Sequence, residues 1–281
     1  MLTPEIVTKI HDFVYEKPRT ITEIAEFLEL NWRTADSYVE KIASEQGTIG
    51  TRLFRGGTRG ALKIVFWNLG AKINSVHVQD ALFSRISSGI KKSDFSPFDI
   101  YQYVDETKRG AVIVENARRK EMISALQAAK KQILFLSGNL SWINDSEGRV
   151  PLLKVIEETV QRGVSVKVLC RIDFPGIKNI LLMQAINNQI GKDVIEIRHM
   201  EQPLRGFIVD SELEEGFFQL KETKNVQDFK AGEMDKNMTL SYTVQDKVWI
   251  TWLSKVFWHS FRSAVPYEKR IKDLRSISKL L

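Results

Sequence analysis

Residues 20–67, TITEIAEFLELNWRTADSYVEKIASEQGTIGTRLFRGGTRGALKIVFW, decide the fold of the first part of this chain. Asn31 can cap a helix over about 32–46, in which apolar residues recur at helical spacing on one face. Gly47 follows at the position where a helix C-terminus favours a left-handed residue. A shorter helix precedes Asn31, and an extended pattern follows Gly47. The stretch therefore predicts two helices and then strands.

Two strands, 48–54 and 61–67, flank the glycine-rich loop 55–60 and predict a β-hairpin. Upstream, Pro4 can begin a further helix that runs to about residue 16. Three helices followed by a hairpin is the order of a winged helix-turn-helix. We assign this fold, and a DNA-binding role, to residues 1–69.

The charged residues of this unit are distributed unevenly. A helix-turn-helix lays its second helix in the major groove, so the first turns of helix 32–46 should contact DNA. The hairpin region is basic and carries no acid, which suits a phosphate backbone or a minor groove. The alternative is a winged helix that contacts protein, with a hairpin that is only solvated. Trp32 can either stack on the DNA backbone or cover the core. The candidate DNA contacts are Trp32, Arg33, Thr34, Ser37, Lys41, Arg52, Arg55, Arg59 and Lys63.

The composition of the whole chain bounds its class. At 281 residues we expect two domains, and the 41 basic against 35 acidic residues give a modest net charge of +6. Cys170 is the only cysteine, which excludes a disulfide scaffold and suits a reducing cytoplasm. The start of the chain has no signal-peptide pattern, and no apolar run is long enough for a bilayer. We therefore expect a cytoplasmic protein with no membrane segment.

Residues 70–110 form a predicted helical linker. Val78, Leu82 and Ile86 lie on one stripe of an amphipathic helix within it. Such a stripe must be buried, either against a second copy of the chain or against the domain that follows. Because winged helices usually read two-fold sites, we expect a homodimer. Burial against the same chain is the alternative.

From residue 111 the pattern alternates between strand and helix, which predicts an α/β domain over 111–281 with a mixed sheet that contains parallel pairs. Its last predicted elements are short strands at 207–209 and 217–220 and a closing aromatic helix at 249–265.

Several stretches of this second part resemble a phospholipase D-like domain. With the winged helix in front, the chain looks most like archaeal TrmB-type transcriptional regulators, in which this domain is degenerate. The resemblance implies a DNA-binding regulator with a sugar-type effector in the old catalytic pocket. The stretches that carry it are 133–138 (ILFLSG), 162–169 (RGVSVKVL), 195–199 (IEIRH), 203–210 (PLRGFIVD) and 252–261 (WLSKVFWHSF).

Active members of that superfamily carry His-x-Lys-x4-Asp, with the histidine as nucleophile. Here Pro203 stands at the histidine position, Arg205 at the lysine position and Asp210 at the aspartate position. Proline cannot be a nucleophile, and His199 lies four residues upstream. We therefore expect no enzyme activity and no catalytic residue. Arg205 and Asp210 remain as candidate ligand-binding residues, with a structural Arg–Asp pair as the alternative.

No other motif carries chemistry. The four histidines are isolated from one another and from Cys170, so we expect no metal site and no cofactor. The predicted partners are double-stranded DNA, a second copy of the chain and a possible small-molecule effector. Two other functions stay open: a catalytically silent interaction module of a larger nucleic-acid machine, and a phospholipase D-type nuclease.

Overall fold

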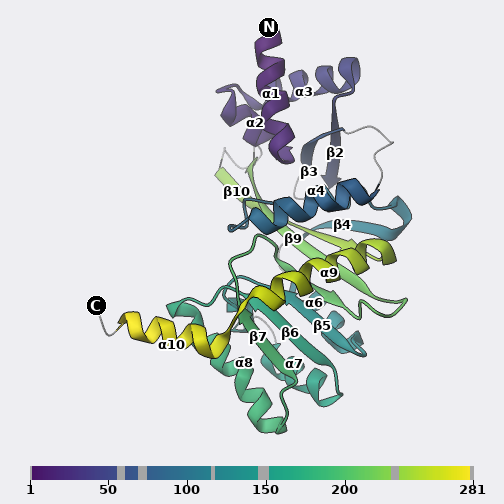
Figure 1. Ribbon diagram of the computed structural model, residues 1–281. Coiled ribbons are helices and arrows are strands. Elements are labelled where there is room, and N and C mark those ends of the chain that lie inside the picture. Colours follow the sequence, from purple (N-terminus) through teal and green to yellow (C-terminus); the bar gives the residue numbers. More distant parts are fainter. Residues whose placement is uncertain are drawn as a thin grey trace.

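The computed structural model describes residues 2–55, 61–68, 75–114, 118–144, 152–228 and 234–278. A winged helix-turn-helix unit comes first (Figure 1). Its short strands pair antiparallel in the order β1-β3-β2. The element order is the predicted one except for β1. This strand was not predicted, because two residues are too few to show a strand period. The elements are α1 (Pro4–Glu16), β1 (Arg19–Thr20), α2 (Ile21–Phe27), α3 (Trp32–Gln46), β2 (Ile49–Arg55) and β3 (Ala61–Trp67).

The helix ends of this unit follow from local sequence. Asn31 Oδ1 accepts the backbone N–H of Thr34 at 2.9 Å and so fixes the start of α3. Gly47 ends α3 with φ of 64°, a left-handed conformation that glycine adopts without strain. Thr20 and Glu23 form a reciprocal capping box at the start of α2. Ala35, Val39 and Ile42 of α3, 1% exposed or less, complete the core.

The second part is built on an eight-stranded mixed sheet in the order β11-β7-β6-β5-β8-β9-β10-β4. The neighbours β5, β6 and β7 are parallel, and every other pair is antiparallel. The predicted fold class is therefore confirmed: a winged helix-turn-helix followed by an α/β domain with a mixed sheet. The strands are β4 (Arg109–Val114), β5 (Gln132–Leu136), β6 (Ser165–Cys170), β7 (Ile195–His199), β8 (Gly206–Val209), β9 (Phe217–Asp228), β10 (Met234–Val244) and β11 (Val265–Pro266).

Helices cover both faces of this sheet. Leu134, Leu136 and Ile208 pack toward α4 and α9, which cross the front of the sheet in Figure 1. Ile133 and Phe135, their neighbours on β5, point the opposite way toward α6, α7, α8 and α10, because side chains alternate along a strand. The helices are α4 (Ser75–Ser88), α5 (Phe98–Tyr101), α6 (Arg118–Ala128), α7 (Leu152–Gln161), α8 (Ile177–Ile190), α9 (Lys247–Ser263) and α10 (Tyr267–Ser278), with 3₁₀ turns η2 (Glu106–Lys108), η3 (Ser141–Asn144) and η4 (Phe174–Gly176).

The C-terminal half contains strands and a helix that the sequence did not predict, among them the short strand β11. The strand predicted at 217–220 continues as β9 to Asp228, and β10 returns beside it. The missed part is rich in polar residues, which gave no apolar run to detect. The helix predicted at 249–265 is α9, but a further helix, α10, follows it and packs Ile271 and Leu274 on the sheet.

The stripe on α4 is buried within its own chain. Val78, Leu82 and Ile86 are 7%, 4% and 5% exposed and pack in the cluster that contains α9 and the front of the sheet. Two alternatives were open for this stripe, and the structure shows the second one, burial against the same chain. The stripe therefore gives no support to the expected homodimer.

The hairpin β2–β3 also packs on the second part. Phe54 of β2 meets Phe98, Tyr101 and Tyr242 edge-on, with ring centroids 6.1–6.2 Å apart. Leu62 and Ile64 of β3 join the same cluster, together with buried residues of β10. One face of the hairpin thus belongs to the junction between the two parts.

Candidate nucleic-acid interface

The helix α3 lies at the end of the molecule remote from α9 and α10 (Figure 1). Arg33, Ser37 and Lys41 are exposed, and their i, i+4, i+8 spacing puts them on one stripe of α3. Lys41 lies 3.9 Å from Glu45 in a solvated pair, which costs little to break. Among the described residues, no acid pairs with Arg33. This basic stripe is available to an anionic partner.

A second stripe of α3 is acidic and turns toward the hairpin. Lys63 of β3 places its Nζ 2.6 Å from Asp36 Oδ1 and 2.7 Å from Glu40 Oε1. Partial burial acts to lower the pKa of Lys63, but hydrogen bonds and charge from the two carboxylates outweigh it and leave the pKa raised. Lys63, predicted as a DNA contact, is thus engaged within the chain, where it neutralises two acids on α3, the predicted recognition helix.

Trp32 and Thr34, the other candidates on α3, are both half-buried. Trp32 packs against the core of the unit, which is the second of the two roles expected for it from the sequence. Thr34 Oγ1 donates to Asn31 Oδ1 at 3.0 Å, so its hydroxyl takes part in the helix cap.

The predicted contacts on the hairpin are placed differently from those on α3. Arg52 Nη1 donates to Glu106 Oε1 of the second part at 3.2 Å, and its side chain is 44% exposed. Arg55 is exposed at the end of β2. Arg59 lies outside the described residues. Of the described hairpin candidates, Arg52 and Lys63 are thus paired with acids of the chain, and Arg55 is exposed.

Arg205, the first candidate ligand-binding residue, lines a cleft of about 570 Å³ that is bordered by the loop following β5. Its Nη1 donates to the backbone carbonyls of Gln202 at 2.8 Å and Leu204 at 2.6 Å. Burial, followed by the nearby charge of Arg171, lowers the pKa of the Arg205 guanidinium. Polar side chains that share the cleft are Ser137, Asn139, Ser141, Asn144, Gln219, Lys221, Thr239 and Ser241.

Asp210, the second candidate, does not line the cleft. It follows β8, whereas Arg205 precedes that strand, and its carboxylate accepts the backbone N–H groups of Lys130, Lys131 and Gln132, each at 2.8 Å. Three such bonds satisfy a buried carboxylate and fix the turn between α6 and β5. The structure thus does not bring Asp210 together with Arg205, either as a ligand site or as a pair.

The residues considered for catalysis are also held by the scaffold. Pro203 is buried, and a Cβ placed on Gly89 would approach its ring to 2.8 Å, so the two residues pack tightly. His199 Nδ1 accepts the backbone N–H of Ile172 at 2.9 Å. Burial raises the pKa of the Cys170 thiol to about 12. Within the described residues there is no group of three acids, histidines or cysteines able to hold a metal ion, and no helix long and apolar enough to cross a membrane.

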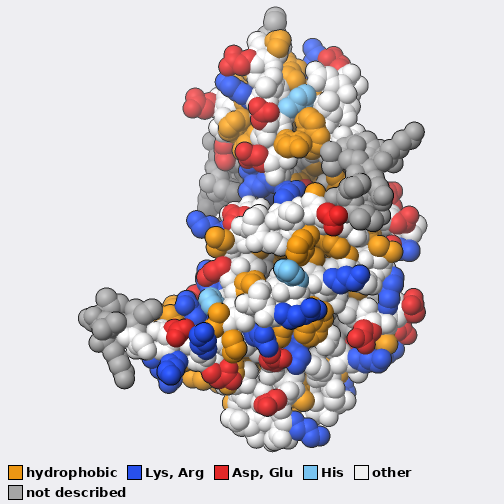
Figure 2. All heavy atoms as spheres, in the orientation of Figure 1, with side chains coloured by type: hydrophobic (Ala, Val, Ile, Leu, Met, Phe, Trp, Pro, Cys, Tyr) orange, Lys and Arg blue, Asp and Glu red, His pale blue; other side chains and the backbone are white. Residues whose placement is uncertain are grey.

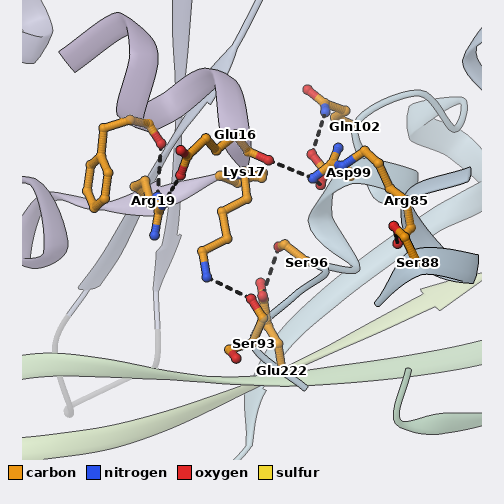
Figure 3. Close-up of polar contacts among 12 residues, drawn as sticks. Glu16, Lys17, Arg19, Arg85, Ser88, Ser93, Ser96, Asp99, Gln102 and Glu222 are labelled. Atoms are coloured by element: carbon orange, nitrogen blue, oxygen red, sulfur yellow. Dashed lines mark hydrogen bonds and ion pairs between the residues drawn. The ribbon is translucent and has the colours of Figure 1, made fainter. Parts of the chain in front are cut away.

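A polar network at the junction was not predicted. It links the end of α1 to α4, to the loop before α5 and to β9 (Figure 3). Arg85 Nη2 donates to the carbonyl of Glu16 at 2.9 Å, and Lys17 Nζ donates to the carbonyl of Ser93 at 2.7 Å. Lys224 Nζ, itself buried, donates to the carbonyl of Pro18 at 3.1 Å. These partners are far apart in sequence and share no motif.

Comparison with known proteins gives similarities of structure only. No protein-family model and no curated protein matches the sequence. The archaeal chromatin protein TrmBL2 aligns over 93% of this chain and 91% of its own, at 15% identity and a TM-score of 0.39. Nuc, a phospholipase D family member from Salmonella typhimurium, aligns over 57% and 99%, at 14% identity and 0.38. NucT from Helicobacter pylori aligns over 57% and 99%, at 12% identity and 0.39. At such identities, residue roles do not transfer to this chain.

Proposed function

We propose that this protein binds double-stranded DNA through the exposed stripe of α3. The observation that carries the proposal is the separation of charge on that helix. Arg33, Ser37 and Lys41 point outward, while Asp36 and Glu40 are held by Lys63. Glu45, the next residue on the outer stripe, is paired with Lys41. A recognition helix needs donors and positive charge on its outer face and no free carboxylate beside the phosphates.

The stripe suits both kinds of DNA contact. A guanidinium in the first turn, such as that of Arg33, can reach the O6 and N7 atoms of guanine in the major groove. A hydroxyl and an ammonium further along, from Ser37 and Lys41, can donate to phosphate oxygens. Arg52 and Lys63 of the hairpin are paired with acids of the chain. In this proposal α3 therefore makes the DNA contact, and the hairpin serves mainly to hold α3 in place.

The test is fluorescence anisotropy on a labelled generic duplex over a range of salt concentrations. The double variant Arg33→Ala/Lys41→Ala should lower the slope of log K against log salt by about one to two. The double variant Lys255→Ala/Arg262→Ala, at an exposed lysine and an exposed arginine of α9, is the matched control and should leave the slope unchanged. If the two variants behave alike, or if the wild-type protein shows no salt-dependent binding, α3 is not the interface.

We further propose that the protein is a regulator of transcription without phosphodiesterase activity. Pro203, which stands at the histidine position of the His-x-Lys-x4-Asp pattern, is buried, and Nδ1 of His199 accepts a backbone N–H. Turnover of a chromogenic phosphodiester that vanishes in Arg205→Ala would overturn this part. We propose the cleft at Arg205 as the effector pocket. Asp210 is not part of it, because this residue does not line the cleft.

A homodimer remains part of the proposal, because two half-sites read together raise the effective affinity. Its interface must lie elsewhere than the stripe on α4. Light scattering that gives the mass of one chain, 32.3 kDa, would rule it out.

A further inference from the structure

A groove of about 500 Å³ lies between the winged-helix unit and the helices beneath it. One wall comes from α1 and β3 of the first unit, and the other from α4, α5 and the turn after α5. It is separate from the stripe on α3 and from the cleft at Arg205. Figure 2 shows apolar side chains on this face of the upper unit, above α4. Its volume lies within the usual range for small-molecule sites.

The walls are mainly aromatic and aliphatic. Tyr15, 67% exposed, and Trp67 meet edge to face, with centroids 5.5 Å apart. Tyr103 lines the groove from the opposite side and stacks on Trp249 behind it. Aromatic faces on both sides favour a flat or aliphatic ligand body, and their π-systems attract a cation.

The polar anchor of the groove is Asp99, which is 5% exposed. Its Oδ1 accepts a long hydrogen bond of 3.5 Å from Gln102 Nε2. Its Oδ2 lies 2.8 Å from Arg85 Nη2, yet no hydrogen bond of acceptable direction reaches it, and the same Nη2 donates to the carbonyl of Glu16 (Figure 3). The contact is thus an ion pair that leaves a buried carboxylate oxygen without a directed donor.

Asp99 Oδ1, which accepts only the long bond from Gln102, keeps acceptor capacity that a ligand donor could use. Burial, only partly offset by Arg85, raises the pKa of Asp99 to about 6, so the carboxylate is mostly ionised at pH 7 and accepts hydrogen bonds only. At Asp99 a ligand must therefore donate, and the carboxylate disfavours an anionic group at that position.

We propose that this groove binds a small organic amine, with an aromatic or aliphatic body between Trp67 and Tyr103 and its N–H groups donating to Asp99. Such a ligand would touch both parts of the chain at once and fix the first unit on α4. The site does not depend on DNA binding.

The test is ligand-observed NMR titration of the full chain with 2-phenylethylamine, and with phenylacetate as the anionic counterpart. We expect saturable binding of the amine with a Kd of about 1–5 mM, as suits a fragment-sized ligand, and at least about tenfold weaker binding of the acid. Ala81, exposed on α4 and lining the groove, allows the groove to be filled without touching the core.

Ala81→Phe should abolish amine binding, whereas Ala128→Phe, at an exposed alanine of α6, should not. Asp99→Asn should reduce the preference for the amine over the acid by about tenfold. Equal binding of amine and acid, binding that survives Ala81→Phe, or no saturable binding of the amine up to about 10 mM would each overturn the proposal.

Discussion

Lys63 provides a sharp test of how α3 is held against the hairpin, because its two candidate roles, an ion pair within the chain and a phosphate contact, predict different measurements. Its side chain is 18% exposed, and its ammonium lies between Asp36, 24% exposed, and Glu40, 55% exposed. Charge-assisted hydrogen bonds in a half-buried setting contribute about 1.5–3 kcal/mol, and an exposed pair contributes less than about 1 kcal/mol. The variant Lys63→Gln should therefore lower the free energy of unfolding by about 2 kcal/mol.

The effect on DNA affinity should be smaller. Each of the two unpaired carboxylates on α3 would repel a phosphate about 10 Å away by about 0.4–1.7 kcal/mol between the dielectric constants of water and of a protein surface. Screening over one Debye length lowers the sum for both carboxylates to about 0.3–1.2 kcal/mol. The slope of log K against log salt should stay within about 0.3 of the wild-type value, because no phosphate contact is removed.

Urea denaturation and anisotropy measure both quantities on the same samples. The triple variant Lys63→Gln/Asp36→Asn/Glu40→Gln should recover most of the affinity, since the released charges are gone. A slope that falls by about one with no loss of stability would refute this reasoning and make Lys63 a phosphate contact after all.

Three further outcomes are expected. Phe54→Ala should cost about 3–5 kcal/mol in urea unfolding, because it empties an aromatic cluster at the junction; a loss below about 1 kcal/mol would mean the hairpin is not seated there. Leu82→Glu should lower stability and leave the oligomeric state unchanged; a shift in mass without destabilisation would contradict the burial of α4. The pKa of Asp99 is raised when folded, so its ionisation destabilises the fold as pH rises from about 4 to 6, and Asp99→Asn should gain stability relative to wild type over that range. The exposed Glu26→Gln is its charge-matched control, and a difference independent of pH would count against the raised pKa.

The first unit could be predicted almost completely, because its signals are local. Asn31 and Gly47 bound α3 in the sequence as they do in the structure, and the change of period at Gly47 locates the hairpin. Short-range chemistry of this kind needs no knowledge of the rest of the chain. The exposed residues of α3 follow from the same helical period.

The roles of individual charges could not be predicted, because they depend on partners distant in sequence. Arg52 and Lys63 read as parts of a basic hairpin, yet each faces a carboxylate contributed by another element. Asp210 matched a catalytic pattern, yet it serves the backbone of the turn before β5. Asp99 carried no signal at all, since its burial arises only where α4, α5 and the first unit meet.

Site-specific photo-crosslinking tests the central claim, DNA contact through α3, most directly. Ser37→Cys would carry a thiol-linked photo-crosslinker on the exposed stripe, and Lys255→Cys would carry it on α9 as control. The single native cysteine, Cys170, is fully buried and will not take the label. The account predicts crosslinks to duplex DNA from position 37 that disappear with added salt, and none from position 255. Equal crosslinking from both positions, or none from position 37, would contradict it.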